Sequence, residues 1–362
     1  MSASCAVALR QTPNRTVPCI YELDPCKDSR WNTLVENHPR ASVFHSSNWL
    51  RVLQAVYGYQ PVAFTSCGPG NALTNGLVFC YINSRLTGRR FVSLPFSDHC
   101  EPLVDRADEL DEMLVRVNER AYENKAKYIE IRPVLLTPGT NSGLTKSRTY
   151  RSHRLDLQRS TDTLFHNFHK DCVQRKIRRA EREGLKYEVG NSERLLQMFF
   201  QLFVKTRRRQ RLPPQPLAWF QGLASAFGDD LEIHIASKSD VPLAGIMTLC
   251  HKKSITYKYG GSDASLHRVG GMALLLWNTI REAKEKGLHE LDLGRSDLTN
   301  QGLIAFKEHW GAAGSSLSYW THPQRQEMDA SRWQNSVAGR IASHAPEIAL
   351  RTAGALLYGH IG

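Results

Sequence analysis

The chain has 362 residues, of which 41% are hydrophobic and 23% are charged. This composition is ordinary for a soluble globular protein, and the length is sufficient for two domains that each bury a core. A net charge of +12 favours an anionic partner, whether a phosphate-bearing substrate, RNA or an anionic membrane surface.

Several classes of protein are excluded by the pattern of apolar residues and cysteines. No apolar run approaches the ~20 residues of a membrane-spanning helix. Arg10 interrupts the N-terminal segment too early for a signal peptide. The eight cysteines form no C-x-x-C pair and no cluster with zinc-ligand spacing. We therefore expect a cytoplasmic protein with reduced thiols, and we predict no metal site.

The first half of the chain follows the pattern of a small α/β domain. Residues 1–17 are expected to form a flexible N-terminal tail, and residues 18–153 a first domain. Alternating apolar and β-branched residues predict strands at 61–65, 76–82 and 91–95. A 3.6-residue apolar period predicts a helix at 108–123, and a further strand follows at 127–132.

The second half repeats this order of elements. Residues 135–146 are rich in Pro, Gly, Ser and Thr and read as a linker or surface loop, before helices at 162–183, 193–210 and 217–227. Strands at 231–236, 243–251 and 254–259 then precede a helix at 270–286 and a strand at 289–293. We assign residues 154–322 to a second domain and residues 323–362 to amphipathic C-terminal helices. The repeated order predicts an α/β protein with two related domains in tandem, each a mixed twisted sheet flanked by helices.

A glycine-containing turn stands between the third strand and the helix of the second domain. It reads Arg268-Val269-Gly270-Gly271-Met272-Ala273. Glycines allow a close approach to the backbone, and the free N–H groups and dipole of a helix N-terminus attract anions. The turn therefore predicts a site for pyrophosphate or another anion.

These features carry a resemblance to a known family. Arg268, Gly271 and Ala273 match the R/Q-x-x-G-x-G/A signature with which GNAT acyltransferases bind acyl-CoA. The surrounding chain resembles the Fem-type aminoacyltransferases, which carry two GNAT-like domains, and their relatives in exopolysaccharide and exosortase gene clusters. The resembling segments are 44–50 (FHSSNWL), 93–98 (SLPFSD), 175–181 (RKIRRAE), 206–209 (TRRR), 257–260 (YKYG) and 302–307 (GLIAFK).

The resemblance implies roles for individual residues. Lys307, beside Phe306, corresponds to a lysine that contacts the reacting acyl group, where a fixed ammonium can stabilise the oxyanion of acyl transfer. Arg209 and Tyr259, with Tyr257 in the same segment, fall where the family binds a nucleotide-linked acceptor. The role of Arg209 could equally belong to one of its neighbours Arg207, Arg208 and Arg211. Alternatively, these four arginines form a solvated helix end without a binding role.

Asp98 is a candidate on the facing wall of the first domain. It is either a base that accepts the proton of the attacking amine, a substrate anchor, or a turn aspartate without a chemical role. The chain departs from the family pattern at Glu101, where similar proteins often have glycine.

Two basic regions remain open between a surface role and binding. Arg175 belongs to a cationic helix face that either binds an anionic substrate or is simply solvated. The C-terminal helices either lie on the inner membrane, as a peripheral contact, or cover the protein's own surface.

The resemblance implies an acyl or aminoacyl transferase that acts on an amine or hydroxyl of a peptidoglycan or exopolysaccharide precursor. The acceptor is an anionic, nucleotide- or lipid-linked saccharide. No tightly bound cofactor is expected, and the co-substrate is acyl-CoA or aminoacyl-tRNA. The alternatives are an inactive GNAT-fold binding protein for RNA or an anionic glycan, and a scaffold within an exopolysaccharide assembly.

Overall fold

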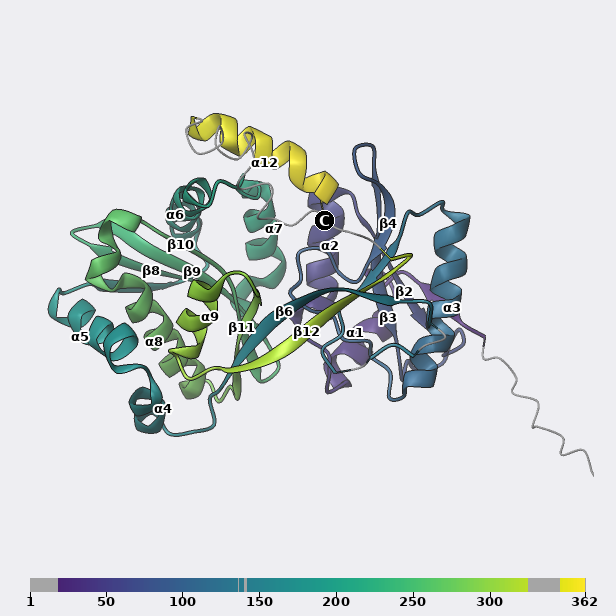
Figure 1. Ribbon diagram of the computed structural model, residues 1–362, viewed down its shortest axis with the longest axis horizontal. Helices are drawn as coiled ribbons and strands as arrows, with labels where there is room; N and C mark the ends of the chain where they lie inside the picture. The colour runs from purple at the N-terminus through teal and green to yellow at the C-terminus, as the bar shows by residue number, and fades with distance from the viewer. Residues whose placement is uncertain (1–18, 136, 140–141, 325–345, 362) are drawn as a thin grey trace, which may run out of the picture.

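The computed structural model describes residues 19–135, 137–139, 142–324 and 346–361 (Figure 1). The predicted N-terminal tail, and positions 325–345 of the predicted C-terminal helices, lie outside the described residues. The described strands form one 12-stranded sheet in the order β1-β2-β3-β4-β5-β12-β6-β11-β10-β9-β8-β7.

The N-terminal module contains strands β1 to β5. Strands β2, β3 and β4 are antiparallel neighbours, helix α3 follows, and β5 returns parallel to β4. Helix α2 begins after Ser46, whose side chain accepts from Trp49 N, and it ends at Gly58 in the left-handed conformation. The elements of the N-terminal module are β1 (Tyr21–Leu23), α1 (Ser29–Asn37), η1 (Val43–His45), α2 (Ser47–Tyr57), β2 (Gln60–Thr65), β3 (Leu77–Ser84), β4 (Gly88–Val92), α3 (Ala107–Glu123) and β5 (Ile129–Ile131).

The C-terminal module contains strands β6 to β12 and repeats the same motif. Strands β8, β9 and β10 are antiparallel, helix α8 follows, and β11 returns parallel to β10. The predicted repeat of strand, strand, strand, helix and strand is therefore confirmed. Its elements are β6 (Thr145–Asp156), α4 (Thr161–Asn167), η3 (Lys170–Gln174), α5 (Arg175–Arg182), β7 (Lys186–Gly190), α6 (Glu193–Arg209), α7 (Leu217–Phe227), η4 (Gly228–Asp230), β8 (Leu231–Lys238), β9 (Val241–His251), β10 (Ser254–Ser262), η5 (Ala264–Val269), α8 (Gly271–Glu285), β11 (Glu290–Asp297), α9 (Gln301–Glu308) and β12 (Ala313–His322).

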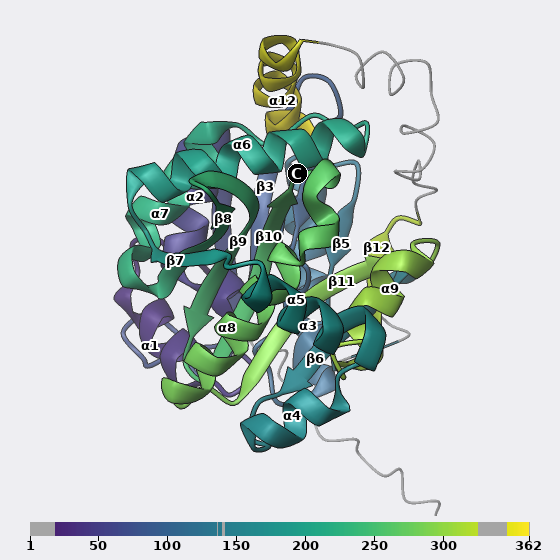
Figure 2. The same ribbon diagram turned by 90° about the vertical axis from the view of Figure 1, so that its left-hand side faces the viewer.

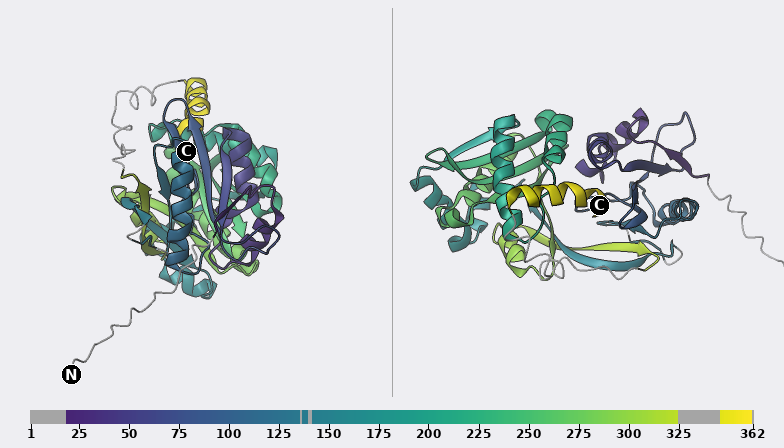
Figure 3. Two further views of the ribbon diagram at one scale, coloured as in Figure 1. Left: turned by 90° about the vertical axis from the view of Figure 1, so that its right-hand side faces the viewer. Right: turned by 90° about the horizontal axis from the view of Figure 1, so that it is seen from above.

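Two long strands join the modules. Strand β12 pairs with β5 of the N-terminal module and with β6 of the C-terminal module, and β6 also pairs with β11. Strand β6 runs through the predicted domain boundary between residues 153 and 154. Figures 1 and 3 show this pair of strands extending from one module to the other. The modules therefore share a single sheet.

A hydrophobic core on one face of the sheet spans both modules. It contains Trp49 from α2, Trp219 from α7 and Met247 from β9, all fully buried. Helices α2 and α7 pack closely. An added Cβ at Gly222 of α7 would lie 3.0 Å from Val52 of α2, so the contact leaves little room for a side chain at position 222. Figure 2 shows α8, α5 and α4 on the other face of the C-terminal module, over a separate core. The continuous core fixes the modules relative to each other.

The prediction of a single helix at 162–183 is wrong. The chain forms α4, the short π-helical segment η3 and α5 instead. Phe168 adopts an extended conformation after α4, and the backbone N–H of His169 donates to His309 O rather than continuing the helix. This tertiary hydrogen bond thus outweighs the local helix propensity.

The described part of the C-terminal tail is helix α12 (Glu347–Ile361), which lies across the top of the molecule in Figure 1. Its face with Leu350 and Tyr358 is buried against the protein. Tyr59 of the N-terminal module donates to Tyr358 O, and Arg207 of α6 donates to the Tyr358 hydroxyl. The described helix therefore covers the protein's own surface and bridges both modules. Within the described residues, no helix is both long enough and apolar enough to cross a membrane.

Candidate functional site

The glycine turn lies beside a cavity at the N-terminus of α8. Gly270 has a φ of 91°, and an added Cβ would lie 2.5 Å from the carbonyl oxygen of Lys176. This close packing of α5 against the turn requires glycine at position 270. The cavity has a volume of ≈ 240 Å³, and its walls include Gly270, Gly271, Ala273, Lys176, His267 and Phe306. The predicted residues Gly270, Gly271 and Ala273 are thus together, whereas Arg268 is exposed on η5 and is not among the lining residues.

Cationic and polar groups surround this cavity, which we call the α8 cavity. Arg209 Nη1 donates to Ser262 O at 3.3 Å, and Ser262 Oγ lies 2.8 Å from His267 Nε2. Burial, followed by the nearby Arg209 cation, lowers the pKa of His267. Lys176 forms part of the cavity wall. Together with the helix N-terminus, these groups can bind a phosphate and leave the apolar walls for an acyl chain.

Two neighbouring exposed residues of the predicted basic helix have different surroundings. Arg175, which we predicted to bind substrate, is exposed and pairs with Asp171 at 2.8 Å. The adjacent Lys176 faces the α8 cavity instead. Lys176 and His267 were not selected from the sequence, although Lys176 lies in the resembling segment 175–181 and His267 directly precedes the turn.

Helix α9 presents Phe306 and Lys307 in different directions. Phe306 lines the α8 cavity, while Lys307 is 3% exposed. The Lys307 Nζ atom donates to the carbonyl oxygens of Gly294 at 2.9 Å and Arg295 at 3.0 Å. Burial lowers the pKa of Lys307 to about 8, although the Asp98 and Asp292 carboxylates oppose this change. Lys307 is therefore a fixed ammonium near neutral pH that begins to deprotonate in mildly alkaline solution.

Asp98 is the centre of an ionic network between the modules. Its carboxylate lies 3.0 Å from Lys258 Nζ and 3.8 Å from Arg295 Nε, and its backbone carbonyl accepts from the Tyr319 hydroxyl at 2.7 Å. Burial raises the pKa of Asp98, but the cations of Lys258 and Arg295 outweigh burial and lower it overall. A carboxylate with two cationic partners is a weak base. The geometry favours anchoring over proton acceptance for Asp98.

Tyr257 and Tyr259, which we predicted to bind the acceptor, pack against different cores. A bulge separates Tyr257 from Tyr259 in the pairing of β10 with β9. Tyr259 packs with the core between the modules and its hydroxyl accepts from Trp219 Nε1 at 2.9 Å. Tyr257 packs against the core beneath α8. Lys258, between them, lies over the ring of Phe44 at 5.1 Å, so this residue links β10 to the N-terminal module.

Glu101, where the chain departs from the family pattern, is buried and structural. Its Oε2 atom accepts hydrogen bonds from the backbone N–H groups of Val134 and Leu135. A glycine could not provide these bonds. Glu101 therefore holds the loop after β5 in this chain, where Asp98 keeps its ion pairs.

One group of described residues has donor atoms close enough to consider a metal. His169, Cys172 and His309 have ligand atoms within 4.8 Å of one another. However, His169 Nδ1 accepts from the backbone N–H groups of Asp171 and Cys172, which requires its proton to be on Nε2. A metal-binding Nε2 must be unprotonated. The hydrogen-bonding pattern is thus incompatible with a metal on this histidine.

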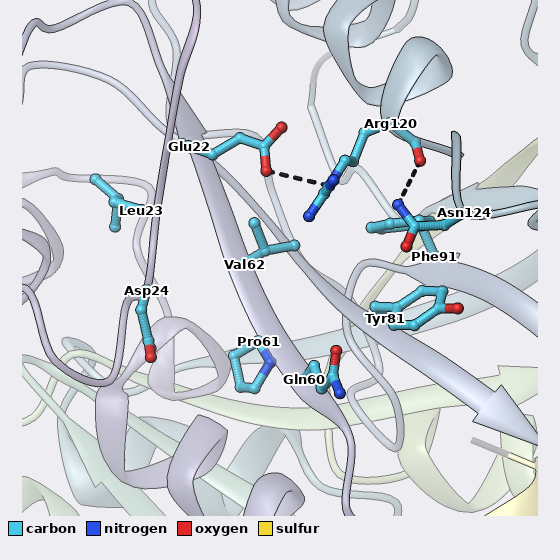
Figure 4. A pocket seen from close by; sticks show the side chains of 10 residues that line it. All are labelled: Glu22, Leu23, Asp24, Gln60, Pro61, Val62, Tyr81, Phe91, Arg120 and Asn124. Carbon is cyan, nitrogen blue, oxygen red and sulfur yellow. Dashed lines mark hydrogen bonds and ion pairs between the residues drawn. The ribbon is translucent and has the colours of Figure 1, made fainter. Parts of the chain in front are cut away.

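Another cavity, of ≈ 340 Å³, lies at the outer edge of the N-terminal module (Figure 4). Figure 4 shows Glu22 beside Arg120, with which it pairs at 3.2 Å. None of the residues selected from the sequence lines this cavity. We therefore place the candidate site at the α8 cavity and at the buried network of Lys307 and Asp98.

The sequence of the C-terminal module matches a known family. Residues 168–308 match the model of the Acetyltransferase (GNAT) domain. The chain is 31% identical over 135 residues to UDP-N-acetylmuramoylpentapeptide-lysine N(6)-alanyltransferase of Weissella viridescens. This match covers 36% of the chain and 40% of the relative, so the chain spans less than half of that relative's length.

Solved structures show the same fold. FemX has a TM-score of 0.64 at 15% identity, covering 80% of this chain and 95% of FemX. A tandem GNAT protein from the clavulanic acid biosynthesis pathway has a TM-score of 0.52 at 11% identity, covering 83% of this chain and 97% of that protein. The chain therefore has the fold of FemX and of this tandem GNAT protein, which confirms the predicted fold, and the GNAT match of residues 168–308 agrees with the predicted resemblance.

Proposed function

We propose that this protein is an N-acyltransferase that moves an activated acyl or aminoacyl group onto an amine of an anionic cell-envelope precursor. The name of the Weissella relative describes transfer of alanyl to a lysine amine of a UDP-linked muramoyl pentapeptide. A peptidoglycan precursor of this kind is the acceptor class that the similarity supports best. An exopolysaccharide precursor, and an acceptor hydroxyl, remain predictions from the sequence.

The observation that carries the proposal is the buried, fixed ammonium of Lys307 on helix α9, the helix whose Phe306 lines the α8 cavity. Phe306 forms part of the cavity wall, and Lys307 follows it with its ammonium fixed by two backbone carbonyls. Acyl transfer to an amine passes through a tetrahedral intermediate with a negatively charged oxygen. A fixed cation near that oxygen stabilises it without the cost of reorganising water. Chemistry of this kind requires no covalent intermediate on the enzyme.

The remaining residues supply binding. The helix N-terminus at Gly270 and Gly271, with Lys176 and Arg209, fits the phosphates of a donor or acceptor. Asp98 holds Lys258 and Arg295 in place and keeps the wall of the N-terminal module against the reaction centre. The GNAT domain match supports acyl-CoA as donor, and the likeness to an alanyltransferase supports aminoacyl-tRNA. We propose that the protein acts in the cytoplasm, where both donors are made.

A two-donor assay tests this function. The purified full chain is incubated with UDP-N-acetylmuramoyl-pentapeptide and either alanyl-tRNA or acetyl-CoA, and the acceptor is analysed by mass spectrometry. We expect acyl addition to the lysine side chain of the pentapeptide with one of the donors. The Lys307→Met variant is the matched negative control. Acyl addition at the same rate with that variant would contradict the proposed role of Lys307.

A further inference from the structure

Helix α12 has an inner face that packs on the protein and an outer face that is apolar. Leu350, Gly354 and Tyr358 are buried on the inner face. Two large apolar side chains stand out on the opposite face: Ile348 is 79% exposed and Leu356 is 68% exposed. About two helical turns separate them, so they lie on the same side of the helix. Residues 352–361 contain no Asp, Glu, Lys or Arg.

The turn between β3 and β4 adds a third apolar side chain beside this face. Leu86 in the turn is 68% exposed. The turn contacts the end of α12, because Ser84 Oγ lies 2.9 Å from His360 Nδ1. Figures 2 and 3 show α12 projecting from the rest of the molecule. We call the exposed side chains of Leu86, Ile348 and Leu356 the α12 surface.

The chain segments that contact α12 are basic. Residues 77–92, which include the turn with Leu86, contain three arginines and no acidic residue. Residues 205–216 contain one lysine and four arginines, again without an acidic residue. This second segment contacts α12 through Arg207 and Pro213, which both bond to the Tyr358 hydroxyl. The α12 surface is thus apolar and has basic neighbours on two sides.

The acidic residues near this surface are few. Helix α12 packs mainly against α2, α6 and β3. Of these three elements, α2 and β3 contain no acidic residue, and α6 contains Glu193 as its first residue. Within α12 itself, Glu347 is neutralised by Arg351, whose Nη1 atom lies 3.6 Å from the Glu347 carboxylate. The charge around the α12 surface therefore favours an anionic partner.

An anionic phospholipid bilayer matches both the charge and the apolar side chains. Each Lys or Arg close to such a bilayer contributes about 1 kcal/mol to binding. Leucine and isoleucine enter the boundary between headgroups and acyl chains. RNA matches the charge alone, because single-stranded bases stack on aromatic side chains, and the three side chains of the α12 surface are aliphatic. A projecting helix also suits the flat surface of a bilayer.

We propose that the α12 surface binds the headgroup region of an anionic phospholipid bilayer. Leu86, Ile348 and Leu356 insert below the phosphates, and the arginines of residues 77–92 and 205–216 bind the phosphates. The inner face of α12 keeps its contacts with both modules, so the helix lies along the bilayer as part of the folded protein. This inference goes beyond the proposed function, because the binding requires neither an acyl donor nor an acceptor.

Sedimentation with vesicles tests the proposal on the full chain. The probe is a vesicle of equal parts phosphatidylglycerol and phosphatidylcholine, and vesicles of phosphatidylcholine alone are the comparison. We expect the protein to sediment with the anionic vesicles and to remain in solution with the neutral ones. Added salt should weaken the binding, since it screens the arginines. Failure to sediment with the anionic vesicles at low salt would overturn the proposal.

A pair of double variants locates the apolar part of the contact. Ile348→Ser/Leu356→Ser removes two side chains of the α12 surface, and we expect at least about tenfold weaker binding to the anionic vesicles. The matched control is Val115→Ser/Leu298→Ser, which removes exposed apolar side chains from α3 and from the turn after β11. Because all four side chains are exposed, both proteins should unfold in urea as the unsubstituted chain does. Equal vesicle binding by the two double variants would contradict the proposal.

A second pair of variants locates the basic part. Arg85→Gln/Arg89→Gln removes two exposed arginines beside Leu86 and should weaken binding to the anionic vesicles. Arg179→Gln/Arg182→Gln removes two exposed arginines from α5 and should bind as the unsubstituted chain does. Loss of binding in the α5 variant alone would place the membrane contact on α5 and overturn the proposal.

RNA is the competing partner in the same experiment. Binding of a single-stranded RNA is measured for the unsubstituted chain and for Ile348→Ser/Leu356→Ser. We expect the double variant to lose vesicle binding without a change in any RNA binding. Loss of RNA binding with unchanged vesicle binding would assign the α12 surface to RNA instead of a membrane.

Discussion

The Nζ atom of Lys307 lies 2.9 Å from the carbonyl oxygen of Gly294, and this contact connects helix α9 to a tight backbone position on β11. Gly294 has a φ of 68°, and an added Cβ would lie 3.1 Å from the Asp98 carboxylate. The position thus brings together the lysine of one module and the aspartate of the other. Two of the three ammonium donors of Lys307 bind backbone carbonyls, and the third is unused by the described residues.

The pKa of Lys307 predicts a pH dependence of catalysis. Burial lowers this pKa to about 8, so the ammonium is present below that pH and is lost as the pH rises through it. The advantage of the unsubstituted enzyme over Lys307→Met in kcat/KM should be greatest below about pH 7 and shrink above about pH 9. The acceptor amine ionises in the same way in both assays, so its effect cancels in the ratio of the two kcat/KM values. A ratio that stays constant across this range would argue against a charged Lys307.

Substitution of Gly270 should disrupt the α8 cavity. Gly270→Ala places a methyl group against the carbonyl oxygen of Lys176 and strains a backbone with a φ of 91°. We expect a loss of about 1–3 kcal/mol in the free energy of unfolding, together with weaker donor binding. Gly302→Ala in α9 is the control, because its nearest neighbour is a side-chain atom at 3.9 Å. Urea unfolding should show a lower free energy of unfolding for Gly270→Ala and a higher one for Gly302→Ala. Alanine stabilises a helix by about 0.5–1 kcal/mol relative to glycine.

Asp98→Asn should destabilise the contact between the modules. The substitution leaves Lys258, whose side chain is 6% exposed, without its carboxylate partner. Breaking a buried pair in this way costs about 3–5 kcal/mol. The pKa of Asp98 is lowered in the folded protein. The difference in the free energy of unfolding between the unsubstituted chain and Asp98→Asn should therefore be largest above about pH 4 and shrink as the pH falls below it. The double variant Asp98→Asn/Lys258→Met should recover part of the loss, and no recovery would contradict a direct pairing.

Helix α12 should contribute to stability through its inner face. Tyr358→Phe removes a hydroxyl that accepts from Arg207 and donates to Pro213 O at 3.3 Å. We expect a loss of about 1–2 kcal/mol, measured by urea unfolding. Ile348→Ala on the outer face is the control, because Ile348 is 79% exposed and its truncation should change stability by less than about 0.5 kcal/mol. Equal effects of the two substitutions would show that α12 does not dock as described.

Much of the framework was predictable because it depends on local patterns. The helix predicted at 217–227 coincides with α7, since Gly228 ends it with a φ of 52°. The strands of both three-strand units also lie where alternation placed them. Strands β6 and β12 were not predicted. They are rich in polar and charged residues, and their pairing with each other and with β5 depends on segments distant in the chain.

The candidate site was predictable where a residue carries a motif, and not where it depends on pairing. The glycine turn and Lys307 could be selected from the sequence; the turn lines the α8 cavity, and the Lys307 ammonium is buried against Gly294. The hydrogen bond of His99 with Asp292, whose carboxylate acts on the pKa of Lys307, could not, since the residues are 193 positions apart and neither belongs to a recognisable spacing. Arg175 was selected because its helix is basic, but only the three-dimensional packing shows that its neighbour Lys176 lines the α8 cavity.

The most direct test of the account compares acyl transfer by the unsubstituted chain, Lys307→Met and Lys253→Met. Lys253 is an exposed lysine in the turn before β10, and its substitution controls for loss of one positive charge. With UDP-N-acetylmuramoyl-pentapeptide as acceptor and a supplied acyl donor, we predict that Lys307→Met lowers kcat by about 10²–10³-fold. Lys253→Met should retain full activity. A Lys307→Met protein that folds normally and transfers acyl groups at the unsubstituted rate would contradict the central claim.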